Sequence, residues 1–154
     1  FTVADLPYAY NALEPHFDAR TMEIHHSKHH KGYAAKANTA LEGTEWADKA
    51  PCEILRNLDK LPINLQAAAR NNVGGFCNHN FFWAMIAPGG SNAPVGNLAA
   101  MIESTFGSLE AMQEAFNKAA ATQFGSGWAW LCVHKGGKVE VCSTPNQDNT
   151  LPNQ

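Results

Sequence analysis

The spacing of apolar residues follows a helical period up to about residue 125 and alternates strictly after it. The helical stretches carry recognisable ends, because Asp18 is suited to cap a helix and Gly43 to terminate one. Pro51 and Pro62 suit first helical positions, and Ser108 suits a cap. The predicted helices span about 18–41, 51–58, 62–86, 97–106 and 109–122.

The alternating stretch predicts a β-hairpin. One strand face carries Trp128, Trp130 and Cys132. The Gly136-Gly137 pair supplies the positive φ angles of a tight turn, and residues 138–143 return as the partner strand. A two-stranded hairpin is marginal in water without a cover. We therefore expect either that the N-terminal helices cover it or that the functional domain continues beyond Gln154.

These elements predict an α+β fold in two parts. Residues 1–88 form an N-terminal domain built on a hairpin of long helices. Residues 89–154 form a C-terminal α/β domain with a small antiparallel sheet, which is incomplete (truncated) in this sequence. A loop rich in Gly, Ser, Asn and Pro over residues 89–96 separates them. The Gly74-Gly75 pair inside the second long helix costs stability, so we expect a close approach there.

Composition excludes several classes of protein. The 154 residues are 45% hydrophobic and 16% charged with a net charge of -3, which excludes a disordered chain and a generic basic nucleic-acid binder. No apolar run approaches the roughly 20 residues of a membrane span. The cysteines form no CxxC motif, and although Cys132 and Cys142 could face each other across the hairpin, we expect reduced thiols. This favours a cytoplasmic location, with the reservation that any targeting peptide would be missing here.

Four of the seven histidines lie within residues 25–30 of the first long helix. Residues four apart share a helix face, so His25 pairs with His29, and His26 with His30. Two histidines are too few for a tight metal site, which needs ligands from elsewhere. His79, in an apolar part of the second long helix, is the candidate, because antiparallel packing would bring it opposite the cluster. A core histidine bonded to a carbonyl remains the alternative. Nucleophile-elbow, phosphate-loop and HExxH motifs are absent, so a histidine metal site is the strongest chemistry.

The whole chain resembles the iron/manganese superoxide dismutases. The segments that carry the resemblance are Leu6-Pro7-Tyr8, Ala12–His16, Met22–Tyr33, Asn71–Trp83, Phe124–Leu131 and Ser143–Asp148. The resemblance implies an enzyme that converts superoxide to dioxygen and hydrogen peroxide by redox cycling of bound manganese, with iron possible. It also implies a homodimer or a dimer-based tetramer.

By position, the resemblance implies a role for eight residues. His25 and His79 would be metal ligands, and His29 and Tyr33 would stand at the substrate funnel. Gln147 would hydrogen-bond the metal-bound solvent and relay protons with Tyr33. The apolar wall would consist of Trp83, Trp128 and Trp130. A glycine at position 75 together with Gln147 resembles the manganese pattern rather than the iron pattern.

The chain departs from the family at its end. The family's other ligands, an Asp and a His in an Asp-x-Trp-Glu-His-Ala-Tyr-Tyr segment, would follow Gln154. Three hypotheses result: a partial record of a manganese-type enzyme, a truncated and inactive remnant that binds metal or a partner, and an unrelated zinc hydrolase. With two of four ligands, we expect this exact polypeptide to be metal-free or weakly metallated.

Overall fold

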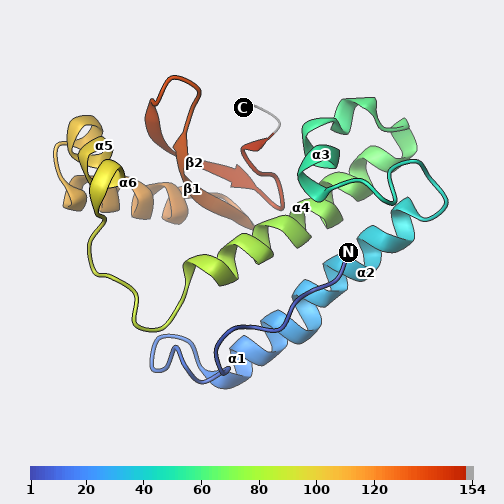
Figure 1. The fold of residues 1–154 in the computed structure, drawn as a ribbon, viewed down its shortest axis with the longest axis horizontal. Helices are drawn as coiled ribbons and strands as arrows, with labels where there is room; N and C mark the ends of the chain where they lie inside the picture. Colours follow the sequence, from blue (N-terminus) through green and yellow to red (C-terminus); the bar gives the residue numbers. More distant parts are fainter. Residues whose placement is uncertain (152–154) are drawn as a thin grey trace. The chain divides into compact units, whose positions relative to one another are not determined.

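Two long helical segments pack side by side in the first part of the chain (Figure 1). The structure is a computed structural model that describes residues 1–151, and the chain divides into two units, residues 1–90 and 91–154. The helical elements of the first unit are α1 (Ala19–Ile24), η1 (His25–His30), α2 (Lys31–Leu41), α3 (Pro51–Arg56), η2 (Leu58–Lys60) and α4 (Ile63–Met85). The predicted α+β class is confirmed, and residues 152–154 of the predicted second domain lie outside the described residues.

The first long helical segment begins where the cap predicts. The Asp18 carboxylate accepts a hydrogen bond from the Thr21 backbone N–H at 2.8 Å. The prediction of one continuous α-helix is wrong in one respect, because η1 is a π-helical stretch over His25–His30. A π-turn shifts the hydrogen bonds by one residue, and such turns concentrate at functional sites. Helix propensity does not distinguish the two hydrogen-bond patterns, so the sequence pattern carries no signal for this turn.

Small and apolar side chains form the contact between the two segments. Ala37 and Ala69 have no exposed surface, and Met22 and Val73 are also buried. The segments run antiparallel, since His25 lies beside His79 whereas Tyr33 lies beside Gly75. α3 packs on α4 and buries Ile54 and Leu55, each of which contributes roughly 1.5–3 kcal/mol of burial.

The second unit combines two helices with the predicted hairpin. Its elements are α5 (Gly96–Phe106), α6 (Leu109–Thr122), β1 (Gly127–Val133) and β2 (Val139–Pro145). The Ser108 hydroxyl caps α6 by accepting from the Ala111 N–H, and Gly136 and Gly137 turn the hairpin at φ 89° and 84°. α6 packs against both strands, so the hairpin is covered from within the second unit. Neither of the two expectations for the hairpin, cover by the N-terminal helices or a longer domain, included this helix.

The strands are antiparallel, and Trp130 lies opposite Cys142. The side chains of Trp128 and Trp130 lie on the same face, as the alternation predicts, with ring centroids 6.0 Å apart. None of the helices within residues 1–151 has the length and apolar character that crossing a bilayer requires.

Candidate metal centre

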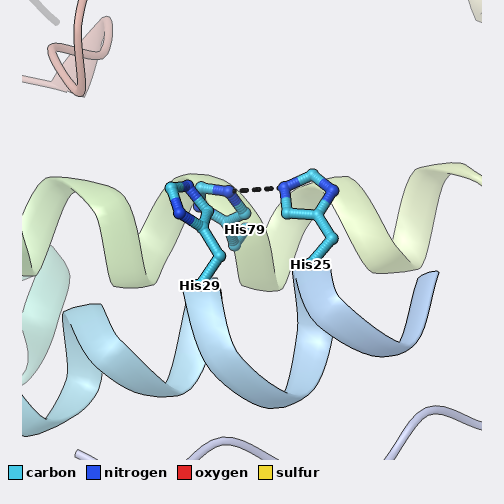
Figure 2. Close-up of side chains that lie close together, drawn as sticks. All are labelled: His25, His29 and His79. Carbon is cyan, nitrogen blue, oxygen red and sulfur yellow. Dashed lines mark hydrogen bonds between the residues drawn. The ribbon is translucent and has the colours of Figure 1, made fainter. Parts of the chain in front are cut away.

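Three histidines from two helical elements meet in the first unit (Figure 2). His25 and His29 come from η1 and His79 comes from α4, and their candidate ligand nitrogens all lie within 4.8 Å of one another. The Nε2 atoms of His25 and His79 face each other at 2.9 Å. His79 is 1% exposed, His25 is half-buried and His29 is exposed. The antiparallel packing therefore brings His79 opposite the first cluster, as the sequence predicts.

Hydrogen bonding sets the tautomer of His79. Its Nδ1 donates to the Gly75 carbonyl at 2.7 Å, so the lone pair of the neutral ring lies on Nε2, toward His25. Burial lowers the pKa of His79 to about 4, with smaller contributions from the neighbouring histidines. Burial, and then His29, also lower the pKa of His25. Both rings are therefore neutral at pH 7, which is the form of imidazole that binds metal.

The facing nitrogens fit a shared transition-metal ion. Two imidazole nitrogens bound about 2.0–2.1 Å from one ion stand about 2.9 Å apart when they subtend a right angle. The observed separation matches this value. In the absence of an ion, His25 Nε2 donates a hydrogen bond to His79 Nε2. The reason is that the one ring proton of neutral His79 lies on Nδ1, which donates to the Gly75 carbonyl. Imidazole donors suit first-row transition metals such as iron, and carboxylate or solvent oxygen suits manganese in the remaining positions.

The other two histidines of the quartet have both ring nitrogens occupied. His30 accepts from the Trp83 indole N–H at its Nδ1, at 3.1 Å, and donates from Nε2 to the Phe76 carbonyl at 3.2 Å. His26 pairs with the Ala4 carbonyl at 2.9 Å and with the Tyr10 hydroxyl at 3.2 Å. Both side chains are buried. Their hydrogen bonds join η1 to the N-terminal segment and to α4. One face of η1 therefore carries the candidate metal ligands, and the other face carries the two buried histidines of the core.

Tyr33 lies against the cluster because Gly75 leaves room for its ring. The ring centroid of Tyr33 is 4.9 Å from that of His29 and 5.4 Å from that of His79. A Cβ atom at position 75 would lie 2.5 Å from Cδ1 of Tyr33. The close approach expected from the Gly74-Gly75 pair therefore occurs at Gly75.

Trp83 closes the other side of the cluster. It is 5% exposed, and its ring meets that of His25 edge-on at a centroid distance of 4.9 Å. The Tyr8 hydroxyl donates to its carbonyl at 3.0 Å. Phe82, to which the sequence assigns no role, lies 5.8 Å from the His25 ring. The run of aromatic residues after His79 is the only sequence signal for this contact.

The remaining predicted site residues lie together in the second unit. Trp128 donates its indole N–H to the Gln147 Oε1 at 3.1 Å. Trp130 donates to the Thr144 hydroxyl at 2.8 Å, and this hydroxyl donates to the Asp148 carbonyl at 2.7 Å. The hairpin and the turn that follows it therefore form one hydrogen-bonded group.

The first unit is an antiparallel helical hairpin whose facing elements bring three possible metal-ligating histidines together, an arrangement from which helical proteins build metal sites. A model of the iron/manganese superoxide dismutase alpha-hairpin domain matches residues 1–87, and a model of that family's C-terminal domain matches residues 94–154. The chain belongs to the iron/manganese superoxide dismutase family.

The names of the relatives include both metals. The chain is 58% identical over 151 residues to an iron superoxide dismutase of Raoultella planticola, covering 98% of this chain and 88% of the relative. It is 52% identical to a manganese/iron superoxide dismutase of Methylomonas sp. (strain J) and 51% identical to a manganese superoxide dismutase of Listeria monocytogenes. Each of these matches covers 98% of this chain and 75% of the relative.

Proposed function

We propose that this protein is a superoxide dismutase that uses bound manganese or iron. The observation that carries the proposal is the facing pair of neutral histidines, His25 and His79, in a chain of this family. When bound, the metal supplies one-electron redox chemistry that oxidises one superoxide to dioxygen and reduces the next to hydrogen peroxide. The residues of the chain hold the metal, exclude bulk water and deliver the protons that the reduction consumes.

His25 and His79 are the proposed ligands. The Gly75 carbonyl fixes the ring orientation of His79, which is how outer hydrogen bonds commonly tune a metal ligand. Trp83 lies edge-on against His25 and keeps water from this side, and His30 holds the indole in place.

His29 and Tyr33 are the proposed proton donors. His29 is exposed, its ring packs on Tyr33, and both rings lie near His79, so protons can enter from solvent along this pair.

Gln147 is the proposed hydrogen-bond partner of the metal-bound solvent, with Trp128 and Trp130 as part of the apolar wall. The hydrogen bond from Trp128 supports this assignment, since it orients the carboxamide of Gln147. We favour manganese over iron, on the combination of glycine at position 75 and Gln147. The named metals of the relatives support either ion.

We further propose a domain division after residue 88, a homodimer or dimer-based tetramer, and a cytoplasmic location. The division of the chain near residue 90 supports the first of these. All four cysteines are free thiols, which supports a reducing compartment.

Metal analysis together with a superoxide-dismutation assay tests the function. We expect His79→Ala to lose the metal that the wild type binds, and the activity with it, because the substitution removes a buried donor. His16→Ala is the matched control, since His16 is an exposed histidine outside the cluster. Stoichiometric metal retained by His79→Ala would show that the ligand is wrong, and a zinc-loaded, inactive wild type would contradict the function.

A second variant separates the two roles open to His29. As a proton donor, His29 is dispensable for metal binding, so His29→Ala should retain the metal and dismute superoxide more slowly. If His29→Ala instead loses the metal to the same extent as His79→Ala, His29 is a third ligand.

A further inference from the structure

Two thiols meet across the hairpin of the second unit. The sulfur atoms of Cys132 on β1 and Cys142 on β2 are 3.4 Å apart, and both cysteines are free. Cys132 is 6% exposed and Cys142 is half-buried. The distance is short enough for a weak S–H hydrogen bond, and the superoxide dismutase chemistry does not use either group.

The twist of the hairpin produces this approach. Cys132 lies opposite Glu140, and it contacts the residue two positions further along β2. Trp130 repeats the offset, since it lies opposite Cys142 and donates to Thr144.

The same offset extends past the end of β1. The His134 backbone N–H donates to the Lys138 carbonyl. Nε2 of His134 lies 2.8 Å from Oε1 of Glu140, which is two positions beyond Lys138. The contacts of Trp130, Cys132 and His134 thus share the same diagonal offset, which reflects the right-handed twist of paired strands. The geometry of the paired strands therefore brings the two sulfurs together, and their short distance does not depend on a chance choice of side-chain rotamer.

We propose that Cys132 and Cys142 are a modification site at which hydrogen peroxide forms a reversible intramolecular disulfide. The proposal rests on the proposed function only for the local source of peroxide, which is the product of superoxide reduction. The thiolate of one cysteine attacks peroxide, so an S–O bond forms, the O–O bond breaks, and the hydroxide that leaves takes up a proton to become water. The second sulfur then attacks this sulfenic acid, an S–S bond forms, and the S–O bond breaks to release a second water. Two thiols lose two electrons, and one peroxide becomes two waters.

The surroundings of the pair distinguish the two sulfurs. Burial, and then the hydrogen bond with Cys132, raise the pKa of Cys142 to about 12, so this thiol stays protonated at neutral pH and Cys132 is the sulfur that attacks peroxide. Cys142 then gives its proton to the hydroxide that leaves the sulfenic acid. Once one sulfur is oxidised, its partner is already in contact, so ring closure competes well with a second oxidation by peroxide.

Peptide mapping of the full chain tests the proposal without metal or dismutase activity. Lys135 and Lys138 lie between the cysteines, so trypsin places Cys132 and Cys142 on separate peptides. The metal-free protein is treated with hydrogen peroxide, its remaining thiols are alkylated under denaturing conditions, and the digest is analysed by mass spectrometry. We expect the two peptides to appear joined, and dithiothreitol to separate them. Because the peroxide is added, failure here leaves the proposed function untouched.

The other thiol pair provides the comparison. Cys52 is exposed and contacts Cys77, so its oxidation reports that peroxide has acted on the protein. In a Cys52→Ser/Cys77→Ser background, the two remaining thiols should disappear together, and Cys142→Ser should abolish the joined peptide. The proposal is overturned if Cys132 and Cys142 remain thiols, or become separate sulfinic acids, under conditions that oxidise Cys52 in the wild type.

Discussion

Replacing Gly75 by alanine should destabilise the helical hairpin, although alanine is the better helix former. Gly75 lies inside α4, and its backbone faces the ring of Tyr33. A Cβ atom there would lie 2.5, 2.6 and 2.7 Å from Cδ1, Cγ and Cε1 of that ring. Cγ of Tyr33 is bonded to its Cβ, close to the α2 backbone. The ring therefore cannot move aside unless the χ angles of Tyr33 change or α2 itself shifts.

The magnitude follows from two opposing effects. Alanine is favoured over glycine in a helix interior by about 1 kcal/mol. Overpacking a well-packed contact costs about 1–3 kcal/mol, and three ring atoms within 2.7 Å place this site at the upper end. The free energy of unfolding should therefore fall by about 2 kcal/mol, as measured by urea denaturation of the metal-free protein.

Gly32 is a matched control on the facing helix. It lies in α2, and a Cβ atom there would have no neighbour within 4 Å. Gly32→Ala should therefore stabilise the protein by up to about 1 kcal/mol, which leaves a gap of about 3 kcal/mol between the two variants. In a Tyr33→Ala background, Gly75→Ala should no longer destabilise. Equal stabilisation by both glycine substitutions, or an undiminished penalty without the Tyr33 ring, would refute the packing argument.

Three further results are expected. Trp83→Phe leaves the buried Nδ1 of His30 without its donor, so the free energy of unfolding should fall by about 1–3 kcal/mol in denaturant titrations; no change would indicate that the hydrogen bond contributes little. Ser108→Ala removes the cap of α6 and should cost about 1 kcal/mol, whereas Ser108→Asp should retain most of the wild-type stability. Manganese(II) at 100 times its dissociation constant should stabilise the wild type by about 2.7 kcal/mol and leave the melting temperature of His79→Ala unchanged; an equal shift in both would place the metal elsewhere.

Local signals were sufficient to predict most of the secondary structure. Asp18 and Ser108 form the expected caps, and the glycine pair at 136–137 turns the hairpin with the expected positive φ angles. These features depend on a few neighbouring residues, so a linear sequence records them. The α+β class follows from the same signals, because the change of hydrophobic period separates helices from strands.

The chemistry of the histidines depends on contacts between residues far apart in the chain. Periodicity places His25 with His29 and His26 with His30, but it does not distinguish a metal cluster from a buried hydrogen-bonded pair. His79 provides that distinction for the first pair, and the Trp83 indole and the Phe76 carbonyl provide it for His30. The π-turn over His25–His30 also left no local signal.

The two glycine positions and the two thiols follow the same principle. Gly32 and Gly75 are both helical glycines in the sequence, yet only Gly75 has an aromatic ring against its backbone. Cys132 and Cys142 belong to opposite strands of a predictable hairpin, but their 3.4 Å contact requires the diagonal that strand twist brings together. Caps, turns and periodicity are short-range properties of the chain, whereas ligand pairs, close approaches and thiol contacts arise only when packing joins distant residues.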